Sequence, residues 1–147
     1  MHILVLNGPN LNLLGVREPE HYGTQTYADL AAMIAQEAEA LGITAECRQT
    51  NHEGTLVDWI QEARGTADGI VINPAAYTHT SVAILDAVKA VQIPTVEVHI
   101  SDPDTRDEFR KISYIRAACI GTVKGKGLAG YLEAMRTLKA FLDTRTT

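Results

Sequence analysis

Two pairs of residues in this sequence have the types and spacing needed for acid–base chemistry. Glu97 and His99 are two residues apart, so on an extended strand both side chains point to the same side. A carboxylate in that place can orient the imidazole and favour its protonated form. Tyr22 follows Arg17 by five residues, and a guanidinium beside a tyrosine lowers the pKa of the phenol toward that of a usable general base. Each pair, taken alone, is also compatible with a structural role.

Further polar residues could bind a small ligand. His79 and Asp86 are seven residues apart and share a helical face if the helix already includes His79. Both could then touch one ligand, or Asp86 could serve a neighbouring subunit. Arg106 and Arg110 are four residues apart and would suit a carboxylate. Neutral hydrogen-bonding side chains near the expected strand ends are Asn10, Asn12, Asn51 and Asn73.

Three short apolar runs must position these groups. They are Ile3–Leu6, Gly69–Ile72 and Pro94–Val98, and polar residues follow each of them. Such runs between helical stretches are typical of buried parallel strands. Ligands of open parallel sheets bind beyond the carboxyl ends of the strands. The polar clusters are therefore expected to meet at one edge of a sheet.

The alternation of strands and helices predicts one α/β domain over residues 1–147. Its expected fold is a flavodoxin-like, doubly wound, five-stranded parallel sheet of order 2-1-3-4-5 with helices on both faces. We expect strands at 2–6, 44–49, 69–73, 94–99 and 117–122, and helices at 27–41, 55–64, 81–91 and 128–142. The stretch from the first strand to about residue 25 is long for a loop, and residues 15–25 are expected to form a lid over the site.

Composition narrows the function classes. The chain has 13 basic and 18 acidic residues, a net charge of −5, which argues against nucleic acids and anionic membranes as partners. We find no signal peptide and no apolar run long enough to span a membrane. Cys47 and Cys119 lie in strand-like segments and are expected to be buried free thiols in a cytoplasmic protein. There is no zinc-ligand spacing, no glycine-rich nucleotide loop and no serine-nucleophile motif.

Four blocks of sequence together resemble the type II 3-dehydroquinate dehydratases. The blocks are LNGPNLNLLGVREPEHYG (Leu6–Gly23), QTNHEG (Gln49–Gly54), INPAAYTHTSVAILDA (Ile72–Ala87) and VEVHIS (Val96–Ser101). The FRKIS and GLAGY segments are similar too, so the resemblance covers nearly the whole chain. It implies reversible dehydration of 3-dehydroquinate to 3-dehydroshikimate through an enolate, without a metal or cofactor. It also implies a dodecamer built as a tetramer of trimers.

The resemblance also implies a role for each matching residue. Tyr22 would remove the proton next to the ketone, and Arg17 would lower the pKa of Tyr22. His99, supported by Glu97, would protonate the departing hydroxyl, while Asn10 would help to hold the enolate through water. The remaining residues carried over by the motifs would bind substrate: Asn73, His79, Asp86, Ile100, Ser101 and Arg110. Of these, Asp86 would reach into the site of a neighbouring subunit.

Three positions depart from the family pattern. Ala75 stands where glycine is frequent, Asp102 where asparagine is frequent, and Lys126 where an aromatic residue is common. The first two flank the expected pocket and bear on substrate affinity. None of the three replaces an expected catalytic group.

Two other function classes fit the same fold. One is a metal-assisted hydrolase that uses His79, His99, Asp86 and Asp102 as ligands. The other is a flavodoxin-like module without catalytic activity that binds a flavin or accepts a phosphate. A phosphate-accepting module needs acidic residues after the first and third strands, where Asn7 and Asn73 stand instead.

Overall fold

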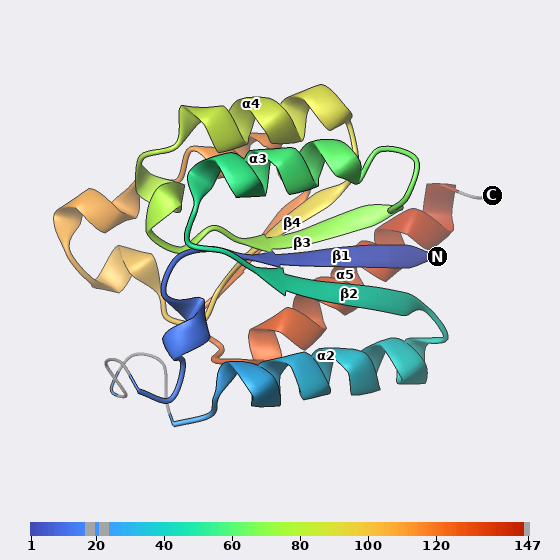
Figure 1. Cartoon of the computed structure of the whole chain (residues 1–147), viewed down its shortest axis with the longest axis horizontal. Coiled ribbons are helices and arrows are strands. Elements are labelled where there is room, and N and C mark those ends of the chain that lie inside the picture. Colours follow the sequence, from blue (N-terminus) through green and yellow to red (C-terminus); the bar gives the residue numbers. More distant parts are fainter. Residues whose placement is uncertain (17–19, 21–23, 146–147) are drawn as a thin grey trace.

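Five parallel strands form a single sheet at the centre of the molecule (Figure 1). The computed structural model describes residues 1–16, 20 and 24–145. The strands are β1 (His2–Asn7), β2 (Thr44–Gln49), β3 (Gly69–Asn73), β4 (Thr95–His99) and β5 (Gly121–Lys124). Their order is β2-β1-β3-β4-β5, and every neighbouring pair is parallel. The predicted fold class and strand order are confirmed.

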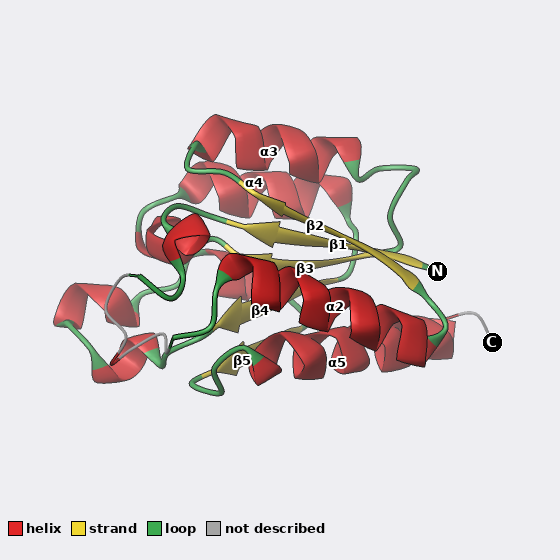
Figure 2. Cartoon of the chain, turned by 60° about the horizontal axis from the view of Figure 1, so that its bottom comes forward, coloured by secondary structure: helices red, strands yellow, loops and turns green. Residues whose placement is uncertain are grey.

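Helices cover both faces of the sheet (Figures 1 and 2). α2 (Tyr27–Leu41) and α5 (Ala129–Arg145) pack on one face, and α3 (Glu53–Glu62) and α4 (Val82–Val91) pack on the other. Alternate residues of a strand point to opposite faces, so β1 contributes Ile3 and Val5 to one core and Leu4 and Leu6 to the other. Burial on both faces explains the uninterrupted apolar runs.

Local sequence signals fix the ends of α2. Thr26 accepts a hydrogen bond from the Asp29 backbone N–H, and the Asp29 carboxylate accepts one from Thr26, which forms a capping box. Gly42 ends the helix with a φ of 69°, a conformation that glycine adopts without strain.

The predicted fifth strand at 117–122 is wrong. Residues Ile115–Ala118 form a 3₁₀ turn, η5, and the strand occupies Gly121–Lys124. In that strand only Val123 is buried, so the edge strand leaves almost no apolar pattern in the sequence. Ile115, two residues before the predicted strand, is buried in η5 in the core cluster that includes α3 and α4 residues. The predicted helices at 55–64 and 128–142 exist, with observed bounds of 53–62 and 129–145.

Short 3₁₀ turns extend from the carboxyl ends of the strands. They are η1 (Leu11–Leu13), η2 (Ala75–His79), η3 (Pro103–Thr105) and η4 (Glu108–Lys111). η1 shows that the long first loop begins with regular structure, contrary to the prediction. Most of the predicted lid, residues 15–25, lies outside the described residues.

The two cysteines are free, as predicted, but both are only partly buried. Cys47 lies in β2, whereas Cys119 lies between η5 and β5 and not in a strand. Among the described helices, none combines the length and apolar character needed to cross a membrane.

Candidate active site

One pocket lies at the carboxyl edge of the sheet, where the segments after β1, β3 and β4 meet. Its walls are Pro9, Asn10, Leu11, Asn73, Ala75, Ala76, His79, His99, Ile100, Ser101, Pro103, Arg106 and Arg110. The three polar clusters were predicted to meet at this edge, and their described residues do so. Close backbone contact brings two of these segments together, because a Cβ atom on Gly8 would lie 2.5 Å from the Pro74 carbonyl oxygen. Glycine at position 8 therefore allows the β1 loop to lie against the β3 loop.

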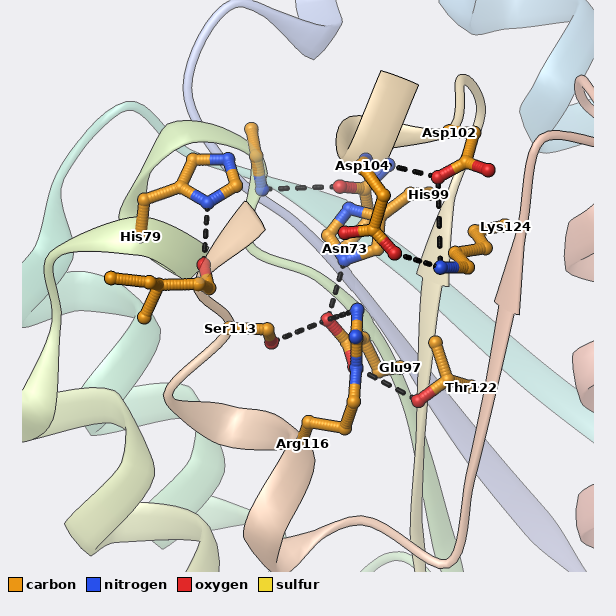
Figure 3. A network of polar contacts seen from close by, with 12 residues as sticks. Asn73, His79, Glu97, His99, Asp102, Asp104, Ser113, Arg116, Thr122 and Lys124 are labelled. Carbon is orange, nitrogen blue, oxygen red and sulfur yellow. Dashed lines mark hydrogen bonds and ion pairs between the residues drawn. The ribbon is translucent and has the colours of Figure 1, made fainter. Parts of the chain in front are cut away.

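The predicted pair of His99 and Glu97 lies at the end of β4, with the imidazole at the pocket (Figure 3). His99 Nε2 is 2.6 Å from Glu97 Oε2. An ionised carboxylate only accepts hydrogen bonds, so Nε2 carries a hydrogen atom and donates the hydrogen bond to Glu97. Nδ1 is then the ring nitrogen that can exchange a proton with a ligand. His99 is 7% exposed and Glu97 is fully buried.

Four of the described side chains converge on the Glu97 carboxylate (Figure 3). Besides His99, the Ser113 hydroxyl donates to Oε2 at 2.6 Å, Thr122 donates to Oε1 at 3.0 Å, and Arg116 Nε donates to Oε1 at 2.9 Å. Burial alone would raise the pKa of Glu97. The hydrogen bonds from His99, Arg116 and Ser113 outweigh burial and lower that pKa to about 2. Glu97 is therefore ionised across the physiological range.

Asn73 is held in place by a buried polar network below the pocket. Its Nδ2 donates to the Tyr131 hydroxyl at 2.9 Å, and that hydroxyl donates to Asn7 Oδ1 at 2.6 Å. Asn73 Oδ1 accepts from the Ala75 backbone N–H at 3.1 Å. Burial raises the pKa of the Tyr131 phenol well above its ordinary value, so it stays neutral and keeps donating. This network therefore fixes the orientation in which the Asn73 amide faces the pocket.

His79 lines the pocket from η2 and not from a helix shared with Asp86. The condition set for a common helical face is not met, because α4 begins only at Val82, three residues later. His79 Nδ1 donates to the Ile112 carbonyl at 2.7 Å, which leaves Nε2 for a ligand. Burial lowers the pKa of His79, and the charges of Arg110, His99 and Arg106 lower it further, whereas the hydrogen bond to the Ile112 carbonyl opposes this shift. The ring is therefore neutral at pH 7, and its Nε2 is suited to accept a hydrogen bond from a hydroxyl.

Two arginines give the pocket its positive charge. Arg106 and Arg110 both line it, although Arg106 directly follows η3 and Arg110 lies in η4, so they do not share one helical face. Arg110 Nε also lies 3.3 Å from Asp107 Oδ2. The predicted binding residues Ile100 and Ser101 form the wall directly after β4. A small anion, such as a carboxylate, fits this lining.

Asn10 lies at the mouth of the pocket in a left-handed conformation, with a φ of 70°. Its backbone N–H donates to Asn51 Oδ1 at 3.0 Å, and the Gln49 amide donates to the same Asn51 oxygen at 3.1 Å. Asn12 Oδ1 also accepts from the Gln49 amide, at 3.3 Å. These contacts join the ends of β1 and β2 and leave the Asn10 side chain exposed beside the pocket.

Of the four residues proposed for a metal-assisted hydrolase, His79 and His99 line the pocket, but Asp86 and Asp102 do not. Asp102 and Asp104 both pair with Lys124, and Asp102 accepts from the Asp104 backbone N–H (Figure 3). Asp86 is exposed on α4 and does not line the pocket of its own chain. Among the described residues no group of three or more histidine, cysteine or acidic side chains is placed to hold a metal ion.

Two of the most important sequence predictions, Arg17 and Tyr22, lie outside the described residues. Conversely, Arg116, Ser113 and Thr122 contact the acid–base pair but were not predicted. They come from residues 16 to 25 positions away from Glu97 in the sequence, so no local spacing could identify them. The role of Tyr131 was missed for the same reason, since it is 58 residues from Asn73.

Comparisons with known proteins identify the family of this chain. A family model described as Dehydroquinase class II matches residues 1–139. The 3-dehydroquinate dehydratase of Geotalea daltonii is 56% identical over 138 residues, which cover 94% of this chain and 96% of that protein. The same-named protein of Dinoroseobacter shibae is 51% identical over 142 residues, which cover 97% and 95%. The crystal structure of type II dehydroquinase from Butyrivibrio crossotus superposes with a TM-score of 0.93 at 50% identity, covering 95% of this chain and 97% of that one. The chain therefore belongs to the class II dehydroquinase family of enzymes.

Proposed function

We propose that this protein is a hydro-lyase that reversibly dehydrates 3-dehydroquinate to 3-dehydroshikimate in aromatic biosynthesis. Family membership supports the substrate. The observation that carries the chemistry is the 2.6 Å pair of His99 and Glu97 at the pocket, close to two arginines that suit the substrate carboxylate.

The reaction needs a base, a group that stabilises an enolate, and an acid. In our proposal Tyr22 takes the proton next to the ketone, and Arg17 keeps its phenol ionised. The developing oxyanion is held by Asn10 through water. His99 then gives its Nδ1 proton to the departing hydroxyl, which leaves as water because hydroxide is a poor leaving group. Glu97 keeps the imidazole in the required orientation.

Substrate binding follows from the other pocket residues. Arg110 and the Ile100–Ser101 segment would hold the carboxylate, while Asn73 and neutral His79 would bind hydroxyl groups. Residues 15–25 would close over the bound substrate and exclude water, which strengthens these polar interactions. We further propose a dodecamer made of four trimers, in which exposed Asp86 completes the site of a neighbouring subunit. The two free thiols support a reducing compartment, the cytoplasm.

The test is the ultraviolet absorbance of the conjugated enone after mixing the protein with 3-dehydroquinate. We expect a rising signal that neither a chelator nor borohydride abolishes. Tyr22→Phe and His99→Gln should each lower kcat by about 10³-fold, because each removes one proton-transfer group. His2→Gln is the matched control, since His2 lies at the opposite end of the sheet, beside Thr44.

Three results would contradict the proposal. Loss of activity with chelator would favour metal chemistry, and inactivation by borohydride in the presence of substrate would indicate an imine. Near-normal turnover of folded Tyr22→Phe would exclude that phenol as the base.

A further inference from the structure

Arg116 lies on the side of Glu97 that faces away from the substrate pocket. It stands on η5, beyond the described lining of the pocket, and still reaches both carboxylate oxygens. Its Nε is 2.9 Å from Oε1, and its Nη2 is 3.4 Å from Oε2. His99 approaches Oε2 from the pocket side (Figure 3). The buried Glu97 carboxylate thus connects two groups: the His99 imidazole, which lines the pocket, and the Arg116 guanidinium, which does not.

We propose that Arg116 is a positioning residue for His99 that acts through Glu97. It fixes the carboxylate with Oε2 toward the imidazole, and it offsets the carboxylate charge so that the imidazolium can release its proton. The inference rests on the proposed role of His99 as the general acid.

The hydrogen bonds explain the fixed orientation. Arg116 and Thr122 hold Oε1, while Ser113 and His99 hold Oε2, so rotation of the carboxylate would break contacts on both oxygens. Ser113 and Thr122 are neutral. Of the described side chains that donate to Glu97 from outside the pocket, Arg116 alone brings a charge.

The charge of Arg116 matters because an acid must also give up its proton. The buried Glu97 carboxylate, 2.6 Å from the imidazole, attracts the positive charge of an imidazolium and so opposes release of its proton. A cation on the same carboxylate weakens that effect. Arg116 also remains positive at every relevant pH, and its hydrogen bond with Glu97 raises its pKa further.

Other charged and titratable groups face this region but are arranged differently. His79, Arg106 and Arg110 lie across the pocket, where bound substrate would meet them. Lys124 is the β5 neighbour of His99, and its charge is matched by Asp102 and Asp104. Arg116 also interacts electrostatically with Asp104 and Lys124. Cys119 lies near Glu97 and Arg116 too, but burial raises the pKa of its thiol to about 12, so it stays neutral. All of these residues are the same in every variant compared.

The experiment is a titration of His99 by NMR in protein with labelled histidine, with its signal assigned from His99→Gln. Arg116→Gln keeps a hydrogen-bonding side chain but removes the charge. We expect it to raise the pKa of His99 by about one unit, a tenfold change in the proton dissociation constant. The alkaline limb of the kcat profile with 3-dehydroquinate should move up by the same amount. Arg116→Lys should stay close to wild type.

The matched control is Arg136→Gln, which removes an arginine paired with Glu37 on the surface of α5 and α2. It should leave the His99 titration unchanged. If folded Arg116→Gln titrates like wild type, or if Arg136→Gln causes the same shift, the inference is wrong.

A second pair of variants covers the case in which Arg116→Gln fails to fold because Glu97 is left unpaired. Glu97→Gln and Glu97→Gln/Arg116→Gln bury no carboxylate and still differ only in the arginine. The two variants should give the same His99 titration, because without the carboxylate Arg116 has nothing to fix or to offset. A higher His99 pKa in the double variant would show that the arginine acts on the imidazole directly and would overturn the inference. The titration needs no turnover. Absence of activity in the unmodified protein would contradict the proposed reaction, whereas an unmoved pKa in an active enzyme would contradict this inference alone.

Discussion

Ala75 is one of three described non-glycine residues with a positive φ, together with Asn10 and Gln92. Its φ is 53°, in the left-handed region, and it follows directly after the β3 end that presents Asn73. Its N–H bonds to Asn73 Oδ1, so the turn and the amide orientation depend on each other. Glycine would adopt this conformation without a Cβ clash. The departure noted in the sequence is therefore a site of local backbone strain at the pocket wall.

Ala75→Gly should relieve that strain and raise the free energy of unfolding by about 1 kcal/mol, because the left-handed penalty exceeds the added chain entropy. Urea unfolding at one fixed protein concentration measures the change. Ala76→Gly is the matched control, since Ala76 is exposed in the same turn without a positive φ, and it should destabilise the protein slightly. Equal effects of the two substitutions would show that Ala75 is not strained.

At the scale of elements, Glu97 joins four parts of the chain. The carboxylate stands on β4 and accepts hydrogen bonds from η5, from β5 and from the Ser113 segment that precedes η5. The unfolded chain has no such partners, so the pKa of Glu97 is about 2 when folded and near 4.5 when unfolded. A depressed pKa contributes stability that is fully present above the unfolded value and is lost as the pH falls through the folded value.

We therefore expect acid to weaken the fold between about pH 4.5 and pH 2 through this residue, by about 3 kcal/mol in total. The measurement compares urea unfolding of wild type and Glu97→Gln at pH 6, 4 and 2. Glutamine does not titrate, so the stability advantage of wild type over the variant should shrink as the pH falls. A constant difference would mean that the surrounding contacts do not favour the ionised form.

The elements that sequence predicted well are those with strong local patterns. β1, β3 and β4 are buried on both faces, so their apolar runs were evident, and the helices between them dictated the strand order. The prediction of β5 was wrong because an edge strand with one buried residue has little apolar pattern in its sequence, while the nearby turn η5 buries Ile115. The same contrast holds for the site. His99 could be predicted because it ends an apolar strand, whereas Arg116 reaches Glu97 only through tertiary folding.

At the scale of the whole molecule, exposed Asp86 allows a test of whether the active site is built by one chain or shared between two chains. If it serves a neighbouring subunit, Asp86→Ala and Tyr22→Phe should each be nearly inactive alone and should complement each other. After joint refolding of equal amounts, about a quarter of the sites would combine an intact Tyr22 with an intact neighbouring Asp86. Activity measures the recovery, and separately refolded proteins mixed afterwards are the control. No recovery in hybrids of confirmed mass would place Asp86 outside a shared site.

The ends of the described chain lie together, on the side away from the pocket. Met1 and Arg145 line the same surface hollow, beside the turn that leads into β4, while the pocket opens at the other edge of the sheet (Figure 1). A short linker could therefore join the two ends, and the chain could be reopened at an exposed turn such as Gly65–Thr66. Such a circular permutant would keep all three pocket-forming segments unbroken, and a surface anchor at either end would lie on the side of the sheet away from the pocket.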